Sequence, residues 1–114
     1  PILFYPVITM DPEFTHKGSH DNLLGEKAKK KDEINYSSDI QVSRKTPRAF
    51  ICLSDDDDCV VPANGVNYYF ELYKHDVPAT LMVYPDGNHG WGIRPNFAYH
   101  LEMLMNLKAW LGSF

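Results

Sequence analysis

The chain has 114 residues, of which 44% are hydrophobic and 23% are charged, and its formal net charge at pH 7 is −4. This composition is typical of one globular domain and excludes a disordered chain. No apolar run approaches the roughly 20 residues that a membrane-spanning helix requires. The one basic cluster, residues 27–31, is followed at once by Asp32 and Glu33, so it is typical of an exposed helix face rather than a nucleic-acid-binding surface. We therefore expect no membrane partner and no nucleic-acid partner.

The two cysteines, Cys52 and Cys59, are too few for a disulfide framework and do not form a C-x-x-C zinc pattern. They leave the cellular compartment open. The chain starts without Met, directly in an apolar run that is typical of a buried strand. We therefore expect it to be one portion of a larger domain.

The first elements in chain order are a strand and a long irregular region. Residues 2–8 form a nearly continuous apolar run, which predicts a strand covered on both faces, as in a parallel sheet. Residues 11–20 are polar and contain Pro and Gly, which predicts a long surface loop. Residues 22–36 are rich in Lys and Glu, which predicts at most short helical structure on the surface.

Stronger signals follow in the middle of the chain. The apolar run at residues 49–53 predicts a second buried strand. Four consecutive aspartates follow it, and because burying their charges is costly, the strand has to end at the solvent-exposed surface. Apolar side chains then recur at helical spacing from Val66 to Tyr73. This spacing predicts a helix that starts at Pro62 and ends near His75.

The last elements are a third strand at residues 79–84 and a turn at residues 85–88. A helix follows at about residues 98–111, with Leu101 and Leu104 on its apolar stripe. Strands and helices therefore alternate along the chain. This order predicts an α/β fold, with a parallel sheet of about three strands and flanking helices.

Titratable side chains follow the second and third predicted strands. Asp55, Asp56, Asp57 and Asp58 come after the second strand, and His89 comes after the third. In an open parallel sheet, the carboxyl ends of the strands lie at one edge, where ligands bind. A carboxylate that holds one nitrogen of an imidazole leaves the other nitrogen free to act as a general base. The alternatives are that the aspartates only end the strand and cap the next helix, or that they bind calcium.

Two segments resemble motifs of the α/β-hydrolase superfamily, and in particular of its acetyl-esterase and carbohydrate-esterase-like serine hydrolases. Asp58-Cys59-Val60-Val61-Pro62 is similar to the acid motif, and Gly87-Asn88-His89-Gly90-Trp91-Gly92 is similar to the histidine loop. Residues 4–25 resemble the sixth strand and the cap-like insertion that follows it. The resemblance implies that residues 1–114 are the C-terminal portion of a single α/β-hydrolase domain, with a cap-like insertion at about residues 11–45.

The resemblance also implies a function. It predicts a serine hydrolase that cleaves short-chain carboxylic esters, such as acetyl esters of carbohydrate, with a Ser-His-Asp triad. His89 would be the base and Asp58 the acid, with Asp57 as the alternative acid because the acidic run blurs the alignment. The G-x-S-x-G motif of the nucleophile does not occur in these residues, so the serine would come from a missing N-terminal part. We expect the chain alone to be inactive.

The same resemblance implies no metal and no organic cofactor. The expected partners are a small ester or acylated carbohydrate substrate and the N-terminal half of the same domain. Two alternatives remain open: a serine peptidase of the prolyl-oligopeptidase type, and a non-catalytic α/β binding module. For Trp91, lining the site and packing beneath the histidine loop are equally open.

Overall fold

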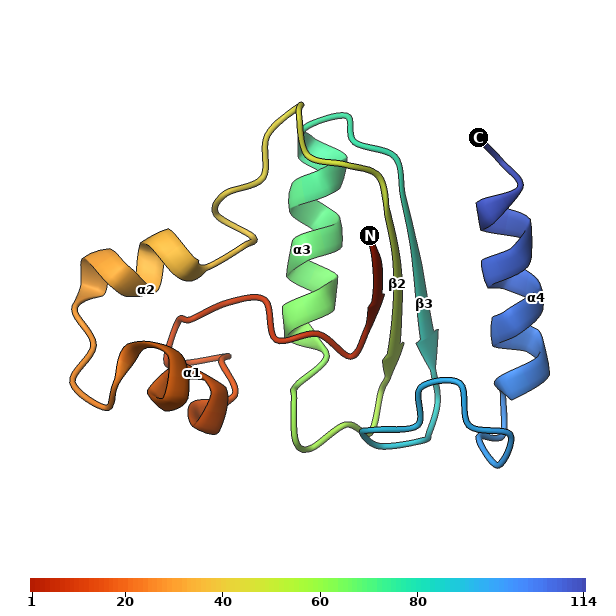
Figure 1. The fold of residues 1–114 in the computed structure, drawn as a ribbon, viewed down its shortest axis with the longest axis horizontal. Helices are drawn as coiled ribbons and strands as arrows, with labels where there is room; N and C mark the ends of the chain where they lie inside the picture. The colour runs from red at the N-terminus through yellow and green to blue at the C-terminus, as the bar shows by residue number, and fades with distance from the viewer.

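In the computed structural model, which describes residues 1–114, three parallel strands lie in the order β1-β2-β3 with helices on both faces. Figure 1 shows α3 on one face of this sheet and α4 on the other. The predicted α/β fold with a three-stranded parallel sheet is confirmed. The elements are β1 (Ile2–Phe4), α1 (Lys17–Leu24), α2 (Lys30–Tyr36), β2 (Ala49–Ser54), α3 (Ala63–Lys74), β3 (Ala79–Tyr84) and α4 (His100–Leu111).

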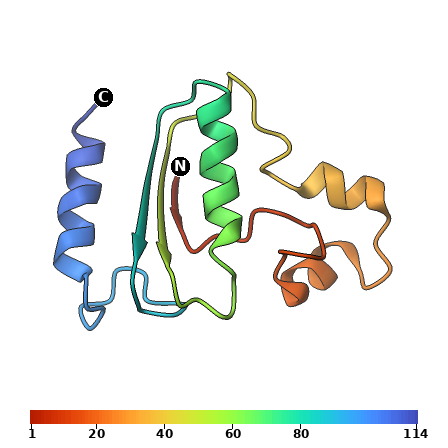
Figure 2. The same ribbon diagram turned by 180° about the vertical axis from the view of Figure 1, so that it is seen from behind.

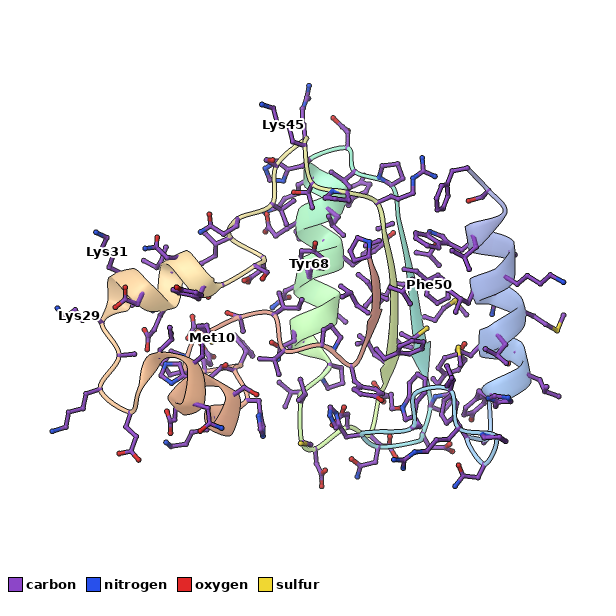
Figure 3. The ribbon with its side chains drawn as sticks, in the orientation of Figure 1. Met10, Lys29, Lys31, Lys45, Phe50 and Tyr68 are labelled. Carbon is purple, nitrogen blue, oxygen red and sulfur yellow. The ribbon has the colours of Figure 1, made fainter.

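The central strand β2 is buried along its whole length because it has a helix over each face. Ile51 and Leu53 belong to the core cluster under α3, together with Leu72 of that helix. Phe50 belongs to the opposite cluster, which includes Met103 of α4, and Figure 3 shows Phe50 in the layer between the sheet and α4. This two-sided burial explains the continuous apolar run that predicted the strand.

The edge strand β1 is shorter than predicted, because the chain leaves the sheet after Phe4. Tyr5 still donates its backbone N–H to the carbonyl of Cys52 at 2.8 Å, but its φ of 38° turns the chain. Pro6 then has no N–H with which to continue the ladder. The prediction that the strand extends to residue 8 is therefore wrong.

The segment between β1 and β2 contains two short helices, α1 and α2, which Figure 2 shows beyond α3 and away from the sheet. The predicted loop at residues 11–20 is wrong in its second half, because α1 begins at Lys17. His16 caps this helix by accepting a hydrogen bond from the backbone N–H of Ser19. Such a local cap compensates for the weak apolar pattern of the segment.

Buried polar side chains attach this segment to the amino end of α3. Asn64 is 1% exposed. Its Oδ1 accepts hydrogen bonds from the backbone N–H groups of Ile8 and Thr9 at 2.9 and 3.1 Å, and its Nδ2 donates to the carbonyls of Phe14 and Val61 at 2.8 and 3.2 Å. The side chain of Asn64 therefore replaces the backbone pairing that this irregular segment cannot provide.

The helices α3 and α4 occur close to where they were predicted, but with different buried faces. The side chains of Val66 and Tyr73 on α3 are exposed, whereas Tyr68 and Leu72 are buried. On α4 the fully buried residue is Met103, whereas Leu101 of the predicted stripe is exposed and Leu104 is partly buried against the same cluster as Met103. None of the helices has both the length and the apolar character needed to cross a membrane.

Candidate active site

The loops that follow β2 and β3 lie side by side at the carboxyl edge of the sheet, at the bottom of Figure 1. The two strands pair in register up to Ser54 and Tyr84, and Asp55 donates its backbone N–H to the carbonyl of Tyr84 at 2.8 Å. This pairing brings the acidic loop against the histidine loop. The titratable side chains therefore meet at the edge of the sheet where the site was predicted.

The acidic loop and the histidine loop are joined by Asp57 and His89. The Nδ1 atom of His89 lies 2.8 Å from Oδ2 of Asp57, and with an ionised carboxylate it is the imidazole N–H that donates. Oδ1 of Asp57 accepts two more hydrogen bonds, from the backbone N–H groups of Cys59 and Val60 at 3.0 and 2.9 Å. Asp57 is only 4% exposed, so three donors stabilise a buried carboxylate.

The side chain of His89 is 31% exposed and reaches the surface beside its loop. Its Nε2 atom makes no hydrogen bond within the chain, while Nδ1 is held by Asp57. A carboxylate on Nδ1 fixes the tautomer with an unprotonated Nε2 and stabilises the imidazolium. The pair can therefore accept a proton at Nε2 and return it.

Asp58, which was predicted to meet His89, is exposed and makes no side-chain hydrogen bond. The predicted pairing of Asp58 with His89 is therefore wrong, and the alternative, Asp57, takes its place. The cause is the turn after β2, in which Asp57 donates its backbone N–H to the carbonyl of Ser54 at 3.3 Å. This turn directs Asp57 toward the histidine loop and leaves Asp58 in solvent.

A second aspartate, Asp56, holds the backbone of the histidine loop. Its carboxylate accepts hydrogen bonds from the N–H groups of Gly87 at 3.3 Å and of Asn88 at 2.7 Å. Asn88 has a left-handed φ of 51°, which the hydrogen bond helps to maintain. Because Asp56 and Asp57 are engaged separately, the carboxylates do not converge on one point, and no group of three or more potential metal ligands is present.

Aromatic side chains pack beneath and beside His89. Trp91 is 5% exposed, donates its indole N–H to Oγ of Ser54 at 2.7 Å, and stacks on Phe97 with ring centroids 4.0 Å apart. Trp91 thus packs beneath the histidine loop, and it also lines the surface pocket that adjoins His89. Gly87 is required at the start of this loop, because a Cβ there would lie 2.6 Å from the Phe97 ring at a φ of 135°.

The ring of Tyr5 lies 4.3 Å from the imidazole of His89, measured between centroids. For a bulky residue, the φ of 38° at Tyr5 is unusual and costs about 1–3 kcal/mol. Sequence reasoning did not select Tyr5 or Asp56. The one feature of the sequence that could have indicated Tyr5 is its position before a proline at the end of a predicted strand. For Asp56 it is the position within the run of four aspartates.

A surface pocket of about 350 Å³ adjoins His89 and is lined by the histidine loop together with Arg94 and Asn96. It is large enough for a small ligand. Its lining is formed by the segment between β3 and α4, so the same loop that carries His89 shapes the adjoining surface.

Within the chain, the buried sulfur and hydroxyl groups near the site are not suited to be the nucleophile. Burial raises the pKa of the Cys52 thiol to about 12, so this side chain stays protonated and unreactive at neutral pH. Ser54 is fully buried, and its Oγ accepts the hydrogen bond from Trp91. Neither Cys52 nor Ser54 is therefore placed to give a proton to Nε2 of His89.

With this geometry in place, the comparison with known proteins identifies the family. The family model described as "Prolyl oligopeptidase family" matches residues 5–113. The chain belongs to the prolyl oligopeptidase family. The match begins directly after β1 and includes the acidic loop and the histidine loop.

The proteins similar to this chain include named esterases. The chain is 40% identical to an acetylxylan esterase of Xylanibacter ruminicola over 116 residues, which is 98% of this chain and 24% of the relative. It is 37% identical to an acetyl ester-xyloside bifunctional hydrolase of Caldicellulosiruptor lactoaceticus, with a TM-score of 0.93 over 98% of this chain and 41% of that one. The chain therefore spans about a quarter of the length of the acetylxylan esterase and about two fifths of the length of the bifunctional hydrolase.

A more distant structure supports the fold alone. A carboxylesterase of Lactobacillus plantarum is 20% identical, with a TM-score of 0.71 over 97% of this chain and 44% of that one. Together with the sheet topology, these neighbours show that the chain has the architecture of the C-terminal part of an α/β hydrolase. The expected resemblance to the acetyl-esterase-like members is confirmed.

Proposed function

We propose that this chain supplies the acid and the general base of a serine esterase that removes acetyl or other short acyl groups from carbohydrate. The observation that carries the proposal is the contact between Asp57 and His89 at the carboxyl edge of the sheet, 2.8 Å long. It is supported by the relatives named acetylxylan esterase and acetyl ester-xyloside hydrolase. The residue assigned as triad acid is Asp57 in place of Asp58.

In the proposed reaction, Asp57 keeps the proton of His89 on Nδ1, so Nε2 is free to accept one. A serine hydroxyl gives its proton to Nε2 as its oxygen attacks the ester carbonyl. The imidazolium that forms is stabilised by Asp57 and passes the proton to the leaving alcohol. Water then attacks the acyl-enzyme, again losing a proton to Nε2, and the acid is released with the serine restored.

The serine and the donors that stabilise the oxyanion are proposed to lie in the part of the protein that the 114 residues do not include. No G-x-S-x-G motif occurs in the chain, and the chain spans 41% of the similar hydrolase. The chain is proposed to be the C-terminal portion of one hydrolase domain, with the segment at about residues 11–45 as its cap-like insertion. Purified residues 1–114 should accordingly release no acid from an ester above background.

The direct test measures acetate release from p-nitrophenyl acetate and from acetylated xylan by the full-length protein. His89→Ala should lower kcat by at least about 10³-fold, because both proton transfers depend on this imidazole. His75→Ala, which changes an imidazole at the other end of α3, is the matched control and should keep full activity. An active His89→Ala protein, or a wild-type protein that does not react with a serine-directed phosphonate, would exclude this mechanism.

The family name supports a second candidate, a serine peptidase, since the same acid and base serve amide cleavage. Chromogenic proline amides assayed beside the esters distinguish the two. We expect ester turnover with little or no amide turnover. Strong amide turnover without ester turnover would replace the esterase by the peptidase.

A further inference from the structure

The edge strand β1 ends at Phe4, and the next residue, Tyr5, packs on the same side of the sheet as Phe4. Along a strand, neighbouring side chains point to opposite faces, and Leu3 and Phe4 follow this rule by packing in the two opposite core clusters. Tyr5 breaks it, because it packs in the same cluster as Phe4. The left-handed φ of 38° at Tyr5 accounts for this departure, so the strained backbone determines where the ring lies.

The ring of Tyr5 packs between the Trp91 ring and the His89 imidazole. It lies 5.2 Å from the Trp91 ring at an interplanar angle of 76° and 4.3 Å from the His89 imidazole at 57°. Trp91 is itself fixed by the hydrogen bond to Ser54 and by stacking on Phe97. A rigid series of contacts therefore runs from the end of β2 through Trp91 and Tyr5 to the imidazole.

The hydrogen bond to Asp57 does not by itself fix the orientation of the His89 imidazole. It stands between Asn88 and Gly90, which have φ values of 51° and 88°, and nothing lies within 4 Å of the position of a Cβ at Gly90. The only polar anchor of the imidazole is the hydrogen bond to Asp57. One hydrogen bond fixes a distance but permits the ring to swing about it, and that motion would change the direction of Nε2.

We propose that Tyr5 is a positioning residue for His89: its ring limits the swing of the imidazole about the hydrogen bond to Asp57, and its left-handed backbone places the ring there. Tyr5 acts through the orientation of the imidazole and takes no part in the proton transfers. The proposal builds on the general-base role of His89 proposed above, and it assigns the strain at the end of β1 to the orientation of Nε2.

Two substitutions in the full-length protein separate the ring from the backbone. Tyr5→Gly removes the ring while suiting the positive φ, so the protein should keep its melting temperature and lose activity. Misdirection of Nε2 should lower kcat on the order of 10- to 100-fold with little change in KM. Tyr5→Phe keeps the ring without the hydroxyl and should restore kcat to near the wild-type value. Tyr73→Leu, at an exposed aromatic residue of α3, should change nothing.

A spectroscopic measurement tests the positioning without relying on activity. In protein labelled with ¹⁵N in histidine, the Nδ1–H signal of His89 reports the hydrogen bond to Asp57. We expect a slowly exchanging proton in the wild type and in Tyr5→Phe, and a faster exchange or a broadened signal in Tyr5→Gly. An unchanged signal in folded Tyr5→Gly overturns the proposal, as does wild-type kcat in that variant.

The two proposals can fail separately. Full activity in His89→Ala would refute the esterase mechanism, and the exchange rate of the Nδ1 proton would still decide whether Tyr5 orients the imidazole. A loss of kcat in Tyr5→Gly that matches a loss of folded protein, with the Nδ1 signal unchanged, would refute the positioning role alone.

Discussion

The Asp56 carboxylate accepts a hydrogen bond from the backbone N–H of Asn88, 2.7 Å long, directly before His89 in the chain. The two residues belong to different loops, so this contact ties the backbone of the histidine loop to the end of β2. The adjacent Asp57 ties the imidazole itself. Two successive carboxylates thus fix the main chain and the side chain of one loop separately.

Asp56→Ala should loosen the histidine loop without removing any group of the proposed triad. We expect about a tenfold loss of kcat, because the loop then samples positions in which the imidazole is misplaced. Asp55→Ala is the matched control, since that carboxylate is exposed and unpaired. Hydrogen exchange at the Asn88 amide should be faster only in Asp56→Ala, and equal exchange rates in both variants would contradict this role.

Asp57→Asn and Asp58→Asn change the same chemical group at adjacent positions. In Asp57→Asn, the carboxamide can donate toward Nδ1 and favours the wrong imidazole tautomer, so kcat should fall on the order of 10³- to 10⁴-fold. Asp58→Asn should stay close to the wild type, because Asp58 is exposed. Steady-state ester hydrolysis of the full-length protein measures both. The reverse ranking would restore the assignment made from the motif.

Asn64→Ala should destabilise the protein with little direct effect on the site. Removing this side chain leaves the N–H groups of Ile8 and Thr9 and the carbonyl of Phe14 without a partner, and each buried unsatisfied group costs about 1–3 kcal/mol. We expect the free energy of unfolding in urea to fall by at least about 2 kcal/mol. Asn67→Ala, at an exposed position of the same helix, should change stability by less than about 0.5 kcal/mol.

The junction of α1 and α2 should respond to pH through His20. Hydrogen bonds from its ring nitrogens to Asp21 and then Glu33 raise its pKa, with contacts of 2.9 and 3.1 Å. Lys17 lies against Asp21, and Lys30 lies 3.6 Å from Glu33. Because the folded pKa exceeds the unfolded value of about 6.5, the stabilising contribution is complete below that pH and is lost as the pH rises through the folded pKa.

Urea unfolding of the wild type and of His20→Gln at pH 5.5 and pH 8.5 checks this prediction. The stability difference between the two proteins should be larger at pH 5.5. Amide exchange in α1 should show the same trend. A difference that is independent of pH, or that grows toward pH 8.5, would show that the imidazolium does not join the two helices.

The sheet and the location of the site could be predicted from the sequence because they depend on long apolar runs and on strand order. The run around Ile51 requires cover on both faces, and parallel strands bring their carboxyl ends to one edge. The buried faces of the helices could not be predicted in this way. On α3 the buried side includes Asn64, used for hydrogen bonds, and Gly65, where a Cβ would lie 2.6 Å from Leu53.

The sequence also could not predict which of the two aspartates, Asp57 or Asp58, contacts His89. Both are aspartates after one strand, and only the turn that joins Asp57 to Ser54 decides which of them faces the histidine loop. Turn geometry depends on contacts that residue type alone does not specify. The contact of Tyr5 with His89 was hidden for a related reason, since a left-handed tyrosine is not expected at a strand end.

The pairing of β2 with β3 has a consequence for proton transfer. The six matched positions from Ala49–Ala79 to Ser54–Tyr84 set the offset between the two loops, and a slip by a single position would displace one loop by about 3.3 Å along the other. That displacement exceeds the whole length of the carboxylate–imidazole contact. The register of the backbone hydrogen bonds between β2 and β3 thus sets the spacing of the acid and the base. A substitution in the interior of the sheet that shifts this register can abolish proton transfer without changing any polar side chain.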